Sequence, residues 1–435
     1  MEMESAIMTA GEERAETGQL TETEGMTDLA RRARRATVEL AVCPASTRDK
    51  ALWAAAAALR ESSQAILEAN TQDLSLSSAT SEAFLDRLRL TPERVEAMAR
   101  GLEDMADLQD PVGRVLEEWT RPNGLRIRRV ATPVGVIGVI YESRPNVGAD
   151  AAGLCIKSGN AVLLRGGSES IHTARAIHKA MQAGLRAAGL PEDAVLIAPD
   201  ADRKHVAEML SAAGLIDLLI PRGGRSLVER VQREARVPVL AHAEGLCHTY
   251  IHAAADHNMA RRIVANAKMR RVGICGATET LLVDAAIAPA ILPLIVSDLQ
   301  ELGCTFKADN AARKIVPSLP AATEQDFDTE WLDAILNVAV VDGVDEALEH
   351  IRQHSSSHTE AIITADEAAA ARFMNGTDSA VVMWNASTQF CDGGEFGFGA
   401  EIGIATGRFH ARGPVGVEQL TTFRYEVIGT GQVRS

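Results

Sequence analysis

Ala161-Val162-Leu163-Leu164-Arg165-Gly166-Gly167-Ser168 places a short apolar run directly before a glycine pair. The run predicts a buried strand, and the glycines predict a tight turn after it. A helix is predicted next, over 171–188, with a serine at its start and Gly189 at its end. A buried strand followed by a glycine turn and a helix is typical of α/β proteins with a parallel sheet.

The same alternation continues on both sides of this stretch. Further strands are predicted at 134–140, 194–197, 216–220 and 237–240, with helices at 203–213 and 227–235. A helical, alanine-rich segment over 28–101 precedes them. A second α/β unit begins near residue 245, with a helix at 258–269 and strands at 248–252, 279–283, 338–341, 361–364 and 381–384. The pattern predicts two doubly wound α/β domains.

Two segments outside this alternation, 113–131 and 415–435, alternate polar and apolar residues between glycine turns. Both are predicted to be strands with polar faces. One interpretation is a ribbon that projects from the body and pairs with another subunit. The other is an ordinary hairpin within the same subunit.

Composition limits the class of protein. The chain has 435 residues, a net charge of −15 and 46% hydrophobic residues, which suits a globular protein of two large domains. Basic patches interleaved with aromatic residues are missing from the sequence, so nucleic acid is not an expected partner. Residues 1–25 carry seven Glu and one Arg, and we expect them to be a disordered leader.

The six cysteines are scattered, without CxxC pairs or His/Cys clusters at zinc spacing. This usage favours reduced thiols in the cytoplasm and no metal site. The longest apolar run, 285–296, contains two prolines and is too short to span a bilayer. The N-terminus has no basic and apolar signal peptide, so we expect no membrane association.

Cys275 is the candidate nucleophile. It lies between Gly273 and Gly276, and small neighbours let a substrate carbonyl approach the sulfur. Lys268, Arg270 and Arg271 precede it, and nearby cations favour the thiolate, so a lowered thiol pKa is predicted. The expected helix C-terminus before the loop acts against an anion. The alternative is a small buried hydrophobic residue.

Two glycine-lined strand ends are candidate cofactor sites. Free N–H groups at Gly166, Gly167 and Ser168 could bind phosphate, and Arg165 could hold a ribose phosphate. The segment Arg222-Gly223-Gly224 repeats the design one strand later in the predicted order. The GxGxxG fingerprint is missing at both strand ends, so each could also be a plain β–α turn with a surface arginine.

Other polar residues are candidates for substrate contacts. Asn146 could supply an amide to an oxyanion, and Arg144 could bind an anion, unless it simply pairs with Glu142 at the surface. Arg412 follows His410 after a glycine-punctuated loop over 395–404. Lys268, Arg270 and Arg412 join Arg144 as candidate substrate or phosphate ligands.

Several segments together resemble the gamma-glutamyl phosphate reductases, also called glutamate-5-semialdehyde dehydrogenases, of the aldehyde dehydrogenase superfamily. The resemblance spans about residues 28–432 and rests on Gly138–Asn146, Lys157–Gly167, Ile220–Gly224, Trp384–Thr388 and His410–Pro414. It implies an aldehyde-dehydrogenase-like fold. Its parts would be a nucleotide-binding domain (26–245, with 113–131 in an oligomerisation ribbon), a catalytic domain (246–414, its end packing back on the first) and an oligomerisation strand (415–435).

The resemblance also implies a reaction: NADPH-dependent reduction of L-glutamyl 5-phosphate to L-glutamate 5-semialdehyde, the second step from glutamate towards proline. Cys275 falls on the family's nucleophile, Asn146 on a candidate oxyanion amide, and Arg165 on a cofactor-ribose position compatible with NADP. A homo-oligomer in the cytoplasm is implied, with glutamate 5-kinase as a candidate partner.

The chain departs from the family pattern at Val272 and Gly276, where Pro and Asn are common. His242 stands where hydrolytic superfamily members carry a general-base Glu, which fits an enzyme whose thioester must avoid activated water. Two rival functions remain: a hydrolytic or CoA-acylating aldehyde dehydrogenase, and a non-catalytic oligomeric scaffold.

Overall fold

A computed structural model describes residues 25–77, 82–142, 144–241 and 244–434. The leader and His242 therefore lie outside the described residues. Five helices open the chain: α1 (Met26–Val42), α2 (Ala45–Glu61), α3 (Ser63–Leu76), α4 (Glu82–Leu88) and α5 (Pro92–Asp107). The alanines of α2 allow helix α7 (Ile171–Ala188) to approach closely, since a Cβ at Gly184 of α7 would lie 2.6 Å from the Ala51 carbonyl oxygen.

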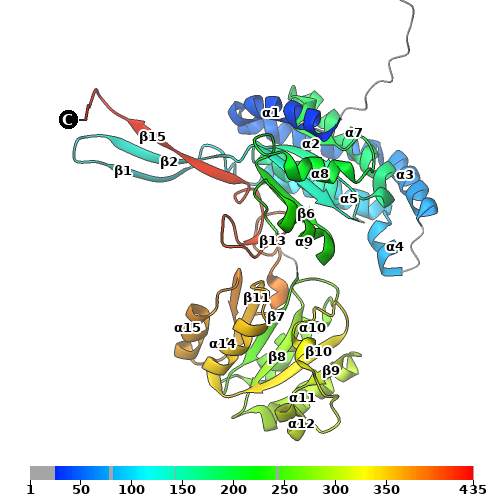
Figure 1. Cartoon of the computed structure of the whole chain (residues 1–435), viewed down its shortest axis with the longest axis vertical. Helices are drawn as coiled ribbons and strands as arrows, with labels where there is room; N and C mark the ends of the chain where they lie inside the picture. The colour runs from blue at the N-terminus through cyan, green and yellow to red at the C-terminus, as the bar shows by residue number, and fades with distance from the viewer. Residues whose placement is uncertain (1–24, 78–81, 143, 242–243, 435) are drawn as a thin grey trace, which may run out of the picture.

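The first domain contains a four-stranded parallel sheet in the order β5-β4-β3-β6. Its strands are β3 (Val136–Tyr141), β4 (Ala161–Arg165), β5 (Val195–Ile197) and β6 (Leu218–Arg222). Its helices are α6 (Val147–Lys157), α7 (Ile171–Ala188), α8 (Lys204–Ser211) and α9 (Arg225–Glu234). The α/β class predicted from the strand–turn–helix pattern is confirmed (Figure 1).

The second domain has a six-stranded parallel sheet in the order β12-β11-β7-β8-β10-β9. The strands are β7 (Cys247–Ile251), β8 (Thr278–Asp284), β9 (Thr305–Ala308), β10 (Ile335–Val341), β11 (Thr359–Ile363) and β12 (Val381–Trp384). The helices are α10 (His257–Met269), α11 (Ala288–Glu301), α12 (Asn310–Ile315), α13 (Glu324–Phe327), α14 (Gly343–His354) and α15 (Glu367–Gly376). Residues of this sheet and of its helices form two apolar clusters that are separate from the core of the first domain.

The C-terminal part of the chain returns to the first domain after β12. Ile402, Val415 and Leu420 are buried in the same apolar core as β3 and β4. The short pair β13 (Ile404–Ala405) and β14 (Gly413–Pro414) lies in this returning segment. The first domain is therefore completed by residues that follow the second domain in the sequence.

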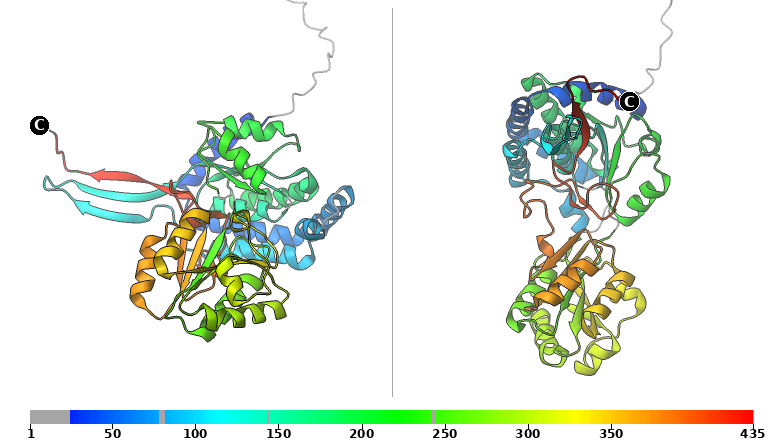
Figure 2. Two further views of the ribbon diagram at one scale, coloured as in Figure 1. Left: turned by 60° about the horizontal axis from the view of Figure 1, so that its bottom comes forward. Right: turned by 90° about the vertical axis from the view of Figure 1, so that its left-hand side faces the viewer.

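A three-stranded antiparallel ribbon projects from the body (Figures 1 and 2). Its order is β1-β2-β15, with β1 (Val115–Thr120), β2 (Arg126–Pro133) and β15 (Thr421–Ile428). Phe423 and Tyr425 on β15 are about half exposed. The strands predicted at both chain segments thus join in one sheet, whose pairing with another subunit stays a prediction.

Two segments differ from the sequence-based assignment. The strand predicted at 237–240 forms only an isolated bridge, in which the Pro238 carbonyl accepts from the Leu219 N–H. Strand β9 was not predicted, because its four residues include a lysine and lack a sustained apolar run.

All six cysteines are described, and all are free thiols. Of the helices that are described, none combines the length and apolar character needed to cross a membrane.

Histidines gather inside the second domain beside α14. The His350 ring lies 4.6 Å from His354, 5.6 Å from His248 and 5.1 Å from Phe327, between ring centres. Burial, together with the nearby His248 and His354, lowers the pKa of His350 to about 3. Since an unfolded histidine titrates near 6.5, the unfolded chain binds more protons below that pH.

Stability should consequently fall as the pH drops from about 6.5 towards 3, and His350 should contribute to this loss. We predict that His350→Leu loses less stability between pH 7.5 and pH 5 than the unmodified protein. Urea unfolding at both pH values measures the difference. His410→Leu, which removes an exposed histidine, is the control and should keep the original pH dependence; equal slopes for all three proteins would contradict the assignment.

Candidate active site

Cys275 lies in the loop between α10 and β8, at the junction of the two domains. Its carbonyl oxygen accepts a hydrogen bond from the Cys247 thiol at 3.0 Å, and its side chain packs on an apolar cluster that includes Ile404. The chain between the domains touches this loop, because a Cβ at Gly245 would lie 2.1 Å from the Cys275 oxygen. Only glycine fits there without moving the cysteine.

A buried ion pair joins the two elements that flank the cysteine loop. Lys268 on α10 donates to Glu279 on β8 at 2.7 Å, and the two side chains are 0% and 1% exposed. The Leu332 N–H also donates to Glu279. The Lys268 ammonium group is enclosed and already paired, which favours a structural role in holding the loop over contact with substrate.

Two other predicted anion ligands have partners within the second domain. Arg270 donates to the side-chain oxygen of Gln389 at 3.3 Å, and Gln389 donates in turn to the Arg271 carbonyl. Arg412 donates to Asp378 at 2.8 Å. These contacts favour a structural role for Arg270 and Arg412 over substrate binding.

Three arginines surround Cys275 without such partners. Arg144 follows β3, Arg222 ends β6 and Arg271 precedes the cysteine. Within the described residues, no hydrogen bond or ion pair reaches any of the three guanidinium groups. Burial lowers the pKa of Arg144, and the nearby Arg222, Arg87 and Arg271 lower it further, while Cys275 opposes the shift. Both domains therefore bring positive charge to the sulfur.

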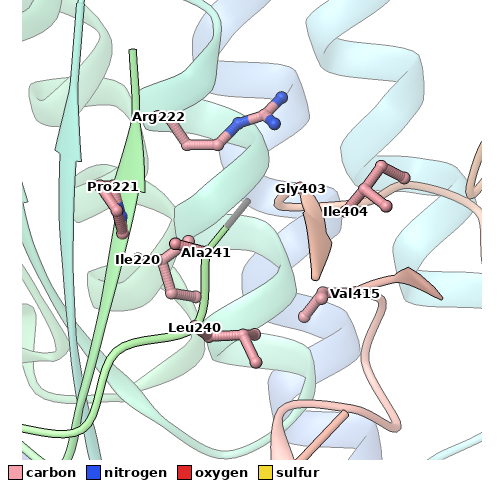
Figure 3. A pocket seen from close by; sticks show the side chains of 8 residues that line it. All are labelled: Ile220, Pro221, Arg222, Leu240, Ala241, Gly403, Ile404 and Val415. Atoms are coloured by element: carbon pink, nitrogen blue, oxygen red, sulfur yellow. The ribbon is translucent and has the colours of Figure 1, made fainter. Parts of the chain in front are cut away.

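Arg222 also lines a small pocket between the end of β6 and the returning segment (Figure 3). Its guanidinium lies against Gly403, where a Cβ would be 3.1 Å from one of its nitrogens. Ile404 lines the same pocket and belongs to the cluster on which Cys275 packs. Arg222, predicted from the sequence to contact the cofactor, is also close enough to Cys275 to lower its pKa electrostatically.

The predicted lowering of the Cys275 pKa is wrong for this structure. Burial raises the pKa of the thiol to about 12; Arg222 is the main group that lowers it, and Glu330 and Glu401 raise it further. The physical reason is that the charge of Lys268 is already neutralised by Glu279, and that partial burial removes water from around the sulfur. A raised pKa keeps the thiol protonated in the free protein, so this proton has to be lost when the sulfur attacks a substrate.

Asn146 precedes α6 and donates from its side-chain amide to Asp150 at 3.0 Å. Burial raises the pKa of Asp150 to about 6. The Asn146 amide has two hydrogens, so one can still be donated to an oxyanion. That role stays a prediction.

The β4 end has the features expected of a nucleotide site. Arg165 is 9% exposed and donates to the carbonyls of Gly166 and Ala201, while its Nε has no partner among the described residues. A Cβ at Gly166 would lie 3.1 Å from the hydroxyl of Tyr141, which is also buried and unpartnered. Buried polar atoms without partners and a glycine cradle fit a phosphate- and hydroxyl-bearing cofactor. Gly167 and Ser168 continue this turn into α7.

At the second glycine pair, Gly223-Gly224, the backbone contacts the carboxylate of Glu142, a residue of the same chain. The Gly224 N–H at the start of α9 donates to Glu142 at 3.0 Å, and a Cβ at Gly223 would lie 2.5 Å from the same oxygen. Glu142 thus occupies the place predicted for a phosphate and does not form the surface pair with Arg144. A cofactor phosphate at Gly223 and Gly224 would have to displace it.

Three residues near this junction have no role predicted from the sequence: Tyr141, Glu330 and Glu401. Glu401 stands in the glycine-punctuated loop, and burial raises its pKa. Glu330 accepts from the Gly245 N–H at 2.9 Å, and burial raises its pKa as well. Glu401 could have been noticed from its place between glycines, but Glu330 carries no local signal.

The two parallel sheets, the ribbon and the cysteine loop define the aldehyde dehydrogenase class. The sequence model of the Aldehyde dehydrogenase family matches residues 5–314. The chain is 74% identical to the gamma-glutamyl phosphate reductase of Gluconobacter oxydans (strain 621H) over 407 residues, which cover 93% of this chain and 95% of the relative. It is 69% identical to that of Acidiphilium cryptum (strain JF-5) over 403 residues, 93% and 96% of the two chains.

The crystal structure of gamma-glutamyl phosphate reductase from Thermotoga maritima matches with a TM-score of 0.93 and 42% identity, covering 95% of this chain and 100% of the other. The chain belongs to the gamma-glutamyl phosphate reductases of the aldehyde dehydrogenase family, a group of oxidoreductases. This family membership excludes the interpretation as a non-catalytic scaffold.

Proposed function

We propose that the protein reduces L-glutamyl 5-phosphate to L-glutamate 5-semialdehyde and phosphate with NADPH, in the route from glutamate to proline. The observation that carries the proposal is the position of Cys275 among Arg144, Arg222 and Arg271. The substrate bears a phosphate and a carboxylate, and guanidinium groups bind both through paired hydrogen bonds. The names of the close relatives support the same substrate.

The reaction requires the Cys275 sulfur to attack the acyl carbon. Negative charge then develops on the acyl oxygen, and the Asn146 amide and the N–H groups of the cysteine loop are its candidate donors. Phosphate leaves with the electron pair of its bond to carbon, and a thioester remains on Cys275. The nucleotide, when bound, would supply the hydride for reduction of this acyl group to the aldehyde, which frees the Cys275 sulfur. Arg165, with the Gly166–Ser168 turn, is the proposed holder of the nucleotide.

An assay in the reverse direction tests this proposal. The purified protein should oxidise glutamate 5-semialdehyde with NADP only when phosphate is present, and NAD should serve poorly. The hydrolytic and CoA-acylating rivals need water or CoA in place of phosphate. Turnover without phosphate would exclude the proposed reaction.

Arg222→Met should raise the KM for phosphate in that assay by about 10–100-fold, because hydrogen bonds to a charged group contribute about 1.5–3 kcal/mol. Arg261→Met is the matched control, since Arg261 pairs with Asp298 on the surface of the second domain. It should leave the KM for phosphate unchanged. An unaltered KM in the Arg222 variant would show that phosphate binds elsewhere.

The ribbon supports a further part of the proposal, a homo-oligomer. Both outer strands, β1 and β15, have one edge unpaired in the described chain, and exposed apolar side chains line β15. Light scattering of the full chain tests the assembly. Free thiols at all six cysteines support a cytoplasmic location, and the short-lived acyl phosphate makes glutamate 5-kinase the proposed partner.

A further inference from the structure

Tyr141 is the last residue of β3, the strand that lies between β4 and β6 in the first sheet. Its side chain is 1% exposed, and its hydroxyl has no hydrogen-bond partner in the described structure. Buried hydroxyl groups in folded proteins are nearly always paired, since an unpaired one loses the hydrogen bonds that it makes in water. An unpaired hydroxyl at this position therefore needs a physical explanation.

The surroundings of the hydroxyl are two glycines. A Cβ added at Gly148, in the first turn of α6, would lie 3.1 Å from the oxygen, and so would one added at Gly166, after β4. The two backbone segments that border the hydroxyl therefore carry no side chains there. Any side chain at either position would crowd the oxygen.

The position of Tyr141 in the sheet indicates which kind of ligand could approach its hydroxyl. Its register partner on β6 is Arg222, and the residue before it pairs with Arg165 on β4. This is the carboxyl edge of the parallel strands, where doubly wound sheets hold their ligands. Arg165 is close enough to influence the tyrosine electrostatically, and its Nε is also unpartnered. At this edge of the sheet, two buried donors, the Tyr141 hydroxyl and the Arg165 Nε–H, therefore lack an acceptor within the described residues.

We infer that the Tyr141 hydroxyl is a cofactor-binding donor, whose acceptor is a sugar or phosphate oxygen of the dinucleotide that enters beside Gly166. This assignment rests on the proposed function, because it takes the cofactor to be NADPH. Burial raises the pKa of Tyr141 far above its usual value, so the hydroxyl keeps its proton and can donate. In the free protein the group is unsatisfied, and binding supplies the missing partner.

The alternative is an enclosed water that satisfies the hydroxyl in the free protein. The two explanations differ in what Tyr141→Phe does. If the hydroxyl is unpaired until the cofactor binds, its removal leaves the free protein as stable as before, or more stable, and weakens NADPH binding. If water satisfies it, removal lowers the stability of the free protein and leaves NADPH binding unchanged.

The experiment compares Tyr141→Phe with Tyr250→Phe, a second buried tyrosine whose hydroxyl donates to Asp284 at 2.8 Å in the other domain. Fluorescence titration measures the Kd for NADPH, and thermal unfolding without ligand measures the Tm. We expect Tyr141→Phe to raise the Kd about tenfold with no fall in Tm. Tyr250→Phe should lower the Tm and keep the Kd, because it leaves Asp284 without its donor.

An unchanged Kd in Tyr141→Phe overturns the assignment, whatever its Tm. Absence of NADPH binding by the unmodified protein would instead overturn the proposed function, and this assignment with it. Normal binding by both the unmodified and the Tyr141→Phe proteins overturns this assignment alone. The two failures are therefore distinguishable in one set of titrations.

Discussion

Cys275→Ser is expected to reduce semialdehyde formation by about 10³-fold or more, because a serine hydroxyl loses its proton far less readily than a thiol and is a much weaker nucleophile towards an acyl group. The change replaces one atom, so the fold and the affinity for NADPH should be retained. Steady-state kinetics, with an NADPH titration on the same sample, measure both properties. Mass spectrometry of the unmodified protein with substrate should detect the acyl group on the peptide that contains Cys275.

Cys391→Ala is the matched control, since Cys391 belongs to the apolar cluster on which Cys275 packs. It should keep most of the activity, because the proposed reaction does not use its sulfur. Undiminished activity in Cys275→Ser would falsify the covalent mechanism. Equal losses in both variants would point to packing around the loop and not to bond formation at the sulfur.

At a pH above the pKa of Glu279, Lys268→Met is expected to lower the free energy of unfolding of the second domain by about 3–5 kcal/mol, because it leaves Glu279 as an uncompensated buried charge. Burial already raises the pKa of Glu279 to about 7 with Lys268 present. The loss should therefore be smaller at acidic pH, where protonation removes the unpaired charge. Urea unfolding followed by tryptophan fluorescence measures it, because Trp331 and Trp384 lie in this domain.

The double variant Lys268→Met with Glu279→Leu provides the control, since replacing both members of a buried pair with apolar residues is often close to neutral. It should recover most of the lost stability. If Lys268 bound substrate and had only a minor structural role, the single variant would keep its stability and raise the KM alone. That outcome would reverse the assignment of Lys268 as a residue that holds the loop.

Much of the fold could be predicted because its signals are local. The apolar run before Gly166 and the helix that ends at Gly189 depend on residues close together in the chain, and each corresponds to an observed element. Strand β9 was missed for the same reason, since a four-residue edge strand carries little local pattern. The candidate nucleophile was also local, because its glycines and its cations are its neighbours in sequence.

The sequence by itself determined the two-domain α/β class and the cysteine loop, since hydrophobic periodicity and turn residues act over a few positions. Only the tertiary structure decided which charged side chains are already paired and which lie near Cys275. It paired Lys268 with Glu279, brought Arg222 from the first domain towards Cys275, and set Glu142 on the Gly224 N–H, 82 residues away. Ionic contacts and burial depend on partners distant in the chain, so the thiol pKa could not be predicted from its neighbours.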